Sequence, residues 1–252
     1  MLGPGKEYLV SARLTPLVHN CGLASVDQLI DRLKKTNDDA LTSQVVEAMV
    51  TTETFFFRDV QPFEMLRTTV LPELIERRRP SRTLNIWCAA GSSGQEPYSI
   101  AMLIKESFPE LGDWRVNIAA TDISQAMLQR CRLGGYSQLE VNRGLPAGLL
   151  LKWFRQEGSQ WHIADSLRAA VTFKQLNLIQ AWPAMPQWDL VFLRNVLIYF
   201  DNETKRTLLD RTSRVLCGDG YLVLGSAETT FNLCDAFCRV DSLKSGFYQL
   251  RR

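Results

Sequence analysis

The chain has 252 residues, 46% of them hydrophobic and 22% charged, which suits one large domain or a catalytic domain with a small partner. This composition excludes a disordered chain, and a formal charge of +2 excludes an overall field that draws the protein to nucleic acid or anionic lipid. No apolar run approaches the roughly 18 residues that cross a bilayer, and the chain does not start as a signal peptide does, so we expect a cytoplasmic protein without membrane insertion. The six scattered cysteines predict free thiols, with neither a disulfide framework nor a metal site.

The first 79 residues predict a helical N-terminal domain. Apolar residues recur every three to four positions over residues 9–18, 26–33 and 41–49. A fourth helix is expected to start after Asp59, acting as its N-cap, and to be bent or interrupted at Pro72. The charged, proline-broken stretch 77–82 predicts the boundary between domain 1–79 and domain 80–252.

After this boundary, predicted strands alternate with helices. The strands are expected at 84–90, 116–123, 171–178, 189–196 and 220–225, and the helices at 96–107 and 202–216. This alternation predicts an α/β fold with a mainly parallel sheet, and the last segments, 237–243 and 247–251, predict an antiparallel hairpin at one edge.

Residues 134–170 interrupt this alternation with repeated glycine and proline. The stretch is too long for a simple crossover loop. We expect an inserted subdomain with a helix around 149–154 and small strands near 161–163.

The first predicted strand runs into a glycine turn at residues 89–94, which fits G-x-G-x-x-G with alanine in the first place. The second strand ends at Asp122, which places a carboxylate at the adjacent edge to accept ribose hydroxyl bonds. Asp122 lies 28 residues beyond Gly94, whereas dinucleotide dehydrogenases use about 20. The pattern therefore favours a nucleoside ligand and makes NAD less favoured.

Glu96 lies beside this turn, where its carboxylate would repel a pyrophosphate and attract a positively charged ligand. S-adenosylmethionine carries a sulfonium and an ammonium group and no phosphate, so Glu96 and Asp122 suit it better than NAD. The structural alternative is that Glu96 compensates the dipole at the start of its helix.

Two further groups carry polar side chains at informative places. Arg194 and Asn195 follow a buried strand at the edge where open α/β sheets bind ligands; alternatively, Arg194 pairs with a carboxylate and Asn195 caps the next turn. Arg58 follows a hydrophobic seam at 55–57 and would bind a carboxylate at a cleft mouth, or else be a solvated charge. Tyr199 is either a site residue or part of the core.

The segments 51–59, 87–102 and 194–200, in this order, resemble the CheR-type family of S-adenosylmethionine-dependent protein-glutamate O-methyltransferases. The resemblance covers nearly the whole chain. It implies a Rossmann-like class I methyltransferase domain, preceded by a small all-α domain and carrying an inserted β-subdomain. It also implies S-adenosylmethionine as cofactor, S-adenosylhomocysteine as product and the cytoplasmic domain of a membrane chemoreceptor as partner, with a monomeric enzyme and no nucleic acid.

The resemblance also implies roles for individual residues. The cofactor would be bound by Thr52, Thr54, Arg58, Ala90, Gly91, Glu96, Asp122, Asn177, Leu178, Arg194 and Asn195. Arg58 would orient the acceptor glutamate and Tyr199 would line the methyl channel. Arg13, with Lys6, stands where the family has a more basic receptor-facing helix.

The chain departs from the family at Thr52, where asparagine is usual. It also begins where relatives enter the second helix of their N-terminal domain, so an incomplete or rearranged helical domain is expected. In the inserted subdomain, Trp153, Phe154 and Trp161 would either grip a receptor peptide or form a local core. No general base is expected, because a glutamate with a pKa near ~4.3 is already ionised at neutral pH.

Four other functions compete with this interpretation. An NAD-dependent oxidoreductase shares the strand–helix–strand logic, and a non-catalytic receptor-binding adaptor would keep the fold. A nucleic-acid methyltransferase is disfavoured by the near-neutral charge and by the lack of a Pro-Pro dipeptide. A small-molecule carboxyl methyltransferase shares the chemistry and stays open.

Overall fold

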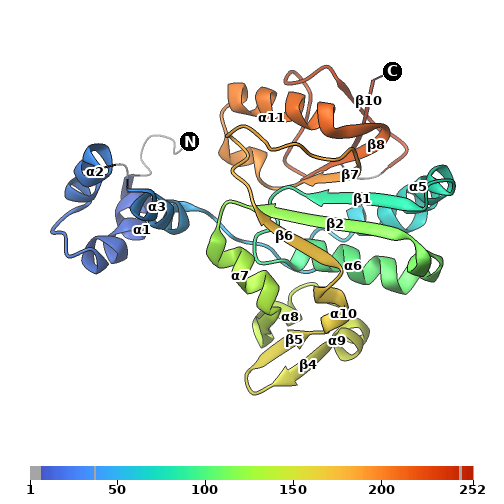
Figure 1. Ribbon diagram of the computed structural model, residues 1–252, viewed down its shortest axis with the longest axis horizontal. Coiled ribbons are helices and arrows are strands. Elements are labelled where there is room, and N and C mark those ends of the chain that lie inside the picture. The colour runs from blue at the N-terminus through green and yellow to red at the C-terminus, as the bar shows by residue number, and fades with distance from the viewer. Residues whose placement is uncertain (1–6, 37, 244–245, 252) are drawn as a thin grey trace.

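The structure, a computed structural model, describes residues 7–36, 38–243 and 246–251. Three helices form a lobe beside the main body: α1 (Glu7–Asn20), α2 (Val26–Lys35) and α3 (Asp39–Met49) (Figure 1). This lobe has a small core of its own, which contains Leu14, Leu17, Val18, Leu29 and Leu41. Lys6 lies outside the described residues.

The next helical stretch packs on the main body and not on the lobe. It consists of α4 (Gln61–Met65), a π-helical turn η1 (Leu66–Val70) and α5 (Leu71–Arg78), so the interruption expected near Pro72 is confirmed. Asp59 does not cap α4, because the N-cap residue is Val60 and the Asp59 carboxylate pairs with Arg194 instead.

The domain boundary at residue 79 stays a prediction, and the hydrophobic packing divides the chain earlier. Leu66, Leu71 and Leu74 belong to the main core, and so does Phe56. In packing terms, the separate unit is the lobe α1–α3, and the connection to it is the extended segment 50–55.

A seven-stranded sheet organises the main body, in the order β6-β2-β1-β7-β8-β10-β9. The strands are β1 (Thr83–Cys88), β2 (Arg115–Asp122), β6 (Val171–Gln175), β7 (Trp188–Leu193), β8 (Leu216–Leu224), β9 (Phe237–Arg239) and β10 (Phe247–Leu250). All pairs from β6 to β8 are parallel, whereas β10 is antiparallel to both β8 and β9. The mainly parallel sheet and its antiparallel edge hairpin are confirmed; residues 244–245, in the hairpin connection, lie outside the described part.

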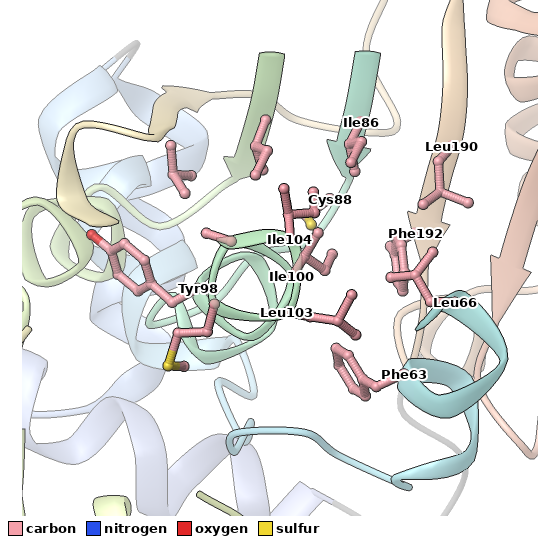
Figure 2. Packing of buried hydrophobic residues seen from close by; sticks show 14 of the residues in the cluster. Phe63, Leu66, Ile86, Cys88, Tyr98, Ile100, Leu103, Ile104, Leu190 and Phe192 are labelled. Carbon is pink, nitrogen blue, oxygen red and sulfur yellow. The ribbon is translucent and has the colours of Figure 1, made fainter. Parts of the chain in front are cut away.

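Helices cover both faces of this sheet because successive side chains of its strands point to opposite faces. Ile86 and Cys88 belong to the core on one face, and Trp87 and Ala89 to the core on the other. On the first face, α6 (Gln95–Ser107) turns its apolar side chains toward β1 and β7 (Figure 2). The second face is covered by α11 (Asn202–Val215), whose Leu208 and Leu209 are fully buried; smaller elements are η2 (Pro109–Asp113), α7 (Gln125–Leu133) and η3 (Leu197–Tyr199).

The inserted subdomain is a three-stranded antiparallel sheet with short helices below the main sheet (Figure 1). Its elements are β3 (Gly135–Ser137), α8 (Gln138–Asn142), α9 (Ala147–Trp153), β4 (Phe154–Glu157), β5 (Gln160–Ile163) and α10 (Asp165–Arg168). Phe154 packs edge-on against Phe56, with ring centroids 5.5 Å apart, and so belongs to the main core. The indoles of Trp153 and Trp161 donate to Glu106 and Gln138, respectively. Among the described residues, no helix combines the length and apolarity that a membrane span requires.

Candidate functional site

A cleft of about 640 Å³ lies at the carboxyl ends of β1, β2, β6 and β7, the edge where open α/β sheets bind ligands. Side chains of α1 and α3 complete its wall from the N-terminal lobe. Of the predicted site residues, the cleft brings together Arg13, Thr52, Thr54, Arg58, Ala90, Glu96, Asp122, Asn177, Leu178, Arg194, Asn195 and Tyr199. Gly91 is the exception, because it is buried against Ala120 of β2.

The two glycines of the turn at 89–94 allow close packing against β2 and α7 and do not line the cleft themselves. The Gly91 N–H donates to the Thr121 carbonyl at 2.8 Å, which pins the turn to β2. Gly94, before α6, has a φ of +96°, and a Cβ there would lie 3.0 Å from both the Cys131 sulfur and the Tyr136 hydroxyl. Ala89, Ala90 and Ser92 of the turn line the cleft, and the Ser92 hydroxyl donates to the Thr52 carbonyl at 2.7 Å.

Asp122 lies at the end of β2 with its carboxylate fixed by backbone donors. The N–H of Ser92 lies 2.8 Å from one carboxylate oxygen and the N–H of Ser124 lies 2.9 Å from the other. Burial raises the pKa of Asp122, while these two backbone bonds lower it. The result is an oriented acceptor, which suits a ligand's hydroxyl groups.

Arg194 is buried, and its guanidinium is committed to partners within the protein. It donates to Glu96 at 2.7 Å, to Asp59 at 2.7 Å and to the Arg58 carbonyl at 3.1 Å. Burial raises the pKa of Glu96, and the facing charge of Arg194 opposes that shift. Arg194 therefore pairs with a carboxylate, which was one of the two alternatives drawn from the sequence. The partner Glu96 is itself buried and lines the cleft.

Arg58 lies at the cleft beside the aromatic seam. Its guanidinium donates to the Glu53 carbonyl at 3.1 Å and lies 5.3 Å from the centre of the Phe55 ring. Arg143 of the inserted subdomain also lies over Phe55, at 4.3 Å, and pairs with the Glu53 carboxylate at 2.7 Å. The same segment that carries Arg58 is thus bound to the subdomain.

Arg13 is anchored where the lobe meets the cleft. Its guanidinium donates to the Met49 carbonyl and, at 3.1 Å, to the Thr51 hydroxyl. Met49 is the last residue of α3, and Thr51 lies two residues beyond it. Arg13 therefore holds the start of the connecting segment, and it also lines the cleft. Its contact with a substrate stays a prediction.

Three residues outside the predicted set support the cleft. Glu228 accepts four backbone N–H bonds around the loop after β7. Arg211 of α11 donates to three successive carbonyls, those of residues 178–180. Glu47 of α3 accepts from the Ser124 hydroxyl and, at 3.2 Å, from the Ala126 N–H. Apart from Gly225, which is three residues before Glu228, their partners are 31 or more residues away in the chain, so no local pattern predicts these contacts.

Comparison with known proteins identifies the family to which the chain is similar. Residues 52–244 match the family model described as "CheR methyltransferase, SAM binding domain". The chain is 40% identical to chemotaxis protein methyltransferase Cher2 of Pseudomonas putida and 42% identical to chemotaxis protein methyltransferase 1 of Pseudomonas aeruginosa, in each case over 100% of this chain and 92% of the relative. It is 39% identical to the chemotaxis protein methyltransferase of Vibrio parahaemolyticus, over 100% of this chain and 91% of that protein.

Proposed function

This chain belongs to the CheR methyltransferase family, and we propose that it methylates glutamate side chains in the cytoplasmic domain of a membrane chemoreceptor. It is an S-adenosylmethionine-dependent methyltransferase, so the second product is S-adenosylhomocysteine. The observation that carries the proposal is one cleft at the carboxyl edge of a mainly parallel sheet, bearing the acidic pair Glu96 and Asp122.

The residues in the cleft fit this cofactor. Asp122 presents a fixed acceptor for ribose hydroxyls, and Glu96 supplies negative charge on the other side of the glycine turn. A pyrophosphate, as in NAD, would meet these two carboxylates, which disfavours the oxidoreductase alternative. Asn177, Leu178 and Asn195 are proposed to complete the adenosine site from the ends of β6 and β7.

When bound, S-adenosylmethionine supplies an electrophilic methyl group on a sulfonium, which a glutamate oxygen attacks to form the methyl ester and S-adenosylhomocysteine. The acceptor is already ionised at neutral pH, so this chain's residues have to orient it and exclude water. We assign orientation of the acceptor to Arg58, whose planar guanidinium matches a carboxylate with two parallel bonds. Tyr199, in η3 at the rim, is assigned to the wall of the methyl channel.

The substrate side of the proposal concerns the lobe. Arg13 projects from α1 into the cleft wall, where a positive side chain suits an acidic receptor helix. The inserted subdomain touches the Arg58 segment through Arg143, so a receptor bound along the cleft would meet both. We place the enzyme in the cytoplasm because the receptor domain that carries the glutamates lies there. We also propose that it acts as a monomer.

A transfer assay with tritiated methyl groups tests the proposal. Purified protein is mixed with labelled S-adenosylmethionine and receptor-containing membranes, and the label is then assayed for base-labile release as methanol. Volatile label from the receptor band is the expected result, and receptors with the acceptor glutamates changed to glutamine serve as the control.

Other outcomes separate the competing functions. Cofactor binding in calorimetry without any transfer would favour a receptor-binding adaptor. Volatile label that fractionates with small molecules would favour a small-molecule carboxyl methyltransferase. A protein that does not bind the cofactor would overturn the roles assigned to Glu96 and Asp122.

A further inference from the structure

The loop that follows β7 is one of two segments that each contribute six residues to the cleft wall; the other is 49–54. Six of the seven residues in 194–200 line it, and the exception is Leu197, which is buried beneath. Asn195 in this loop has a φ of +56°, a left-handed conformation that is uncommon outside glycine and that asparagine adopts more readily than most residues. The loop also needs support from its surroundings, because its backbone N–H groups leave the sheet and must find other acceptors.

The Glu228 carboxylate provides this support. One oxygen accepts from the N–H groups of Val196 at 2.9 Å and Leu197 at 2.7 Å. The other accepts from Asn195 at 2.8 Å and from Gly225, next to the end of β8, at 2.7 Å. Both oxygens are therefore used twice, and the loop is bound to the end of the neighbouring parallel strand.

Gly225 leaves the space that this arrangement requires. A Cβ at this position would lie 2.7 Å from the Asn195 side-chain nitrogen and 2.8 Å from the Glu228 carboxylate. Because β7 and β8 are paired in register up to Leu193 and Leu224, the loop and Gly225 leave the sheet side by side. The absence of a side chain lets the carboxylate reach across from one strand end to the other.

We propose that Glu228 is a positioning residue for methyl transfer, which sets Asn195 and Tyr199 against the bound cofactor and acceptor. Glu228 is not part of the cleft wall and acts through the backbone of residues 195–197. The inference rests on the proposed function, because it assigns Glu228 a part in that reaction. It predicts that loss of the carboxylate changes how the cofactor binds, beyond any change in the amount of folded protein.

Glu228→Gln is the direct test, because an amide has one acceptor oxygen and would turn N–H donors toward two of the four backbone donors. Asp201→Asn is the matched control. Like Glu228, Asp201 accepts a backbone N–H with its carboxylate: it caps α11 by accepting from the Thr204 N–H at 2.8 Å. Unlike Glu228, it is exposed and binds a backbone group outside residues 195–197. It is not part of the cleft wall. Both variants and the wild type are assayed for the Kd and KM of S-adenosylmethionine, for kcat and for thermal unfolding.

For Glu228→Gln we expect about a tenfold or larger rise in Kd and KM, together with a lower kcat, since small misplacements of binding groups cost this much. Asp201→Asn should keep the wild-type constants even if its melting temperature drops. A residue with a purely structural role would lower only the active fraction, leaving Kd and KM unchanged. Values within twofold of wild type in Glu228→Gln would therefore overturn the proposal.

A second variant keeps the test valid if Glu228→Gln does not fold. Gly225→Ala retains the carboxylate but pushes a methyl group between it and Asn195, so the same rise in KM is expected. A wild-type KM in folded Gly225→Ala would contradict the proposal. The wild type in the same assay distinguishes failure of the Glu228 proposal from failure of the proposed function. If the wild type neither binds the cofactor nor transfers methyl groups, the proposed function itself fails.

Discussion

Arg194 donates to Glu96 across 2.7 Å in an interior where solvent reaches 1% of one side chain and 11% of the other. Both residues line the cleft, so this pair contributes to the charge of the cleft together with Asp122. Burial raises the pKa of Glu96 and so favours its neutral form, and the facing charge of Arg194 opposes that shift.

Replacing Arg194 alone should destabilise the protein more than replacing both Arg194 and Glu96. In Arg194→Met the free energy of unfolding should fall by about 3–5 kcal/mol, because Glu96 becomes a buried charge without a partner. Its pKa rises further, so stability decreases as the pH rises above the ordinary value of 4.5, where the unfolded chain already loses the proton.

The control for this prediction is the double variant Arg194→Met/Glu96→Gln, followed with the single variant in urea unfolding at pH 5 and pH 8. We expect the double variant to recover much of the lost stability and to lose the pH dependence. Equal stabilities of single and double variants at both pH values would contradict the account.

Arg58→Ala should reduce kcat/KM by about 100-fold, the scale on which a misplaced reactant slows a reaction, while the fold remains intact. The Arg58 side chain donates to the Glu53 carbonyl and lies over the Phe55 ring, while the contact with Arg194 uses the Arg58 backbone, so truncation of the side chain removes little from the core. Arg58→Lys should fall between alanine and wild type, because an ammonium group keeps the charge but not the two parallel bonds. Near-normal turnover of Arg58→Ala would remove this residue from the mechanism.

Two glycines of the inserted subdomain provide an opposed pair of substitutions. In Gly144→Ala the new Cβ would lie 2.1 Å from the Phe56 carbonyl oxygen, at a φ of +85°. The subdomain would have to shift away from Phe56 and the main core, so the variant should unfold at a lower temperature. Gly148 lies exposed in α9 with open space around its Cβ position, and Gly148→Ala should stabilise the protein by about 0.5–1 kcal/mol through helix propensity. Thermal unfolding should show opposite shifts; equal shifts would rule out the close approach at Gly144.

Acid sensitivity should include a contribution from the end of the sheet opposite the cleft. Arg78 donates to both oxygens of Asp219, at 2.6 Å and 2.9 Å, and holds the pKa of that carboxyl below its ordinary value of 3.8. The unfolded chain then binds the proton more readily, so this stabilisation is full above pH 3.8 and is lost as the pH falls through the lowered pKa.

Asp219→Asn removes this contribution. Its midpoint in urea should lie below that of the wild type at pH 7, and the difference should shrink toward pH 3. The KM for S-adenosylmethionine should not change, because neither Arg78 nor Asp219 lines the cleft. A constant difference in midpoint over the whole pH range would show that Asp219 acts by packing alone.

The sequence predicted the elements that depend on runs of apolar residues, because central strands such as β1 and β7 are buried on both faces. The run at 84–90 predicted β1, and its side chains alternate between two cores as expected. The edge hairpin, the inserted subdomain and the interruption near Pro72 also follow from local signals. Asp59 failed as an N-cap because Arg194, a buried arginine directly after β7, offers its carboxylate a stronger partner than a helix N–H does.

The site was predictable where a chemically specific residue lies at the end of a strand, as with Asp122 and Asn195. It was not predictable where support comes from a distant segment. Glu228 and Arg211 have partners that only the folded sheet brings near, and neither sits in a recognisable motif. Gly91 has the sequence context of a ligand-binding glycine, yet its space is taken up by the Ala120 side chain.

The segment 50–54 both connects the N-terminal lobe and forms part of the cleft wall. The lobe itself carries Leu9, Arg13, Val46 and Met49 of the cleft wall, so a rotation of the lobe changes the shape of the cleft. Occupancy of the cleft and orientation of the lobe therefore belong to one thermodynamic cycle. A ligand that binds better in one orientation of the lobe favours that orientation, and a partner that favours the same orientation increases the affinity for the ligand by the same factor.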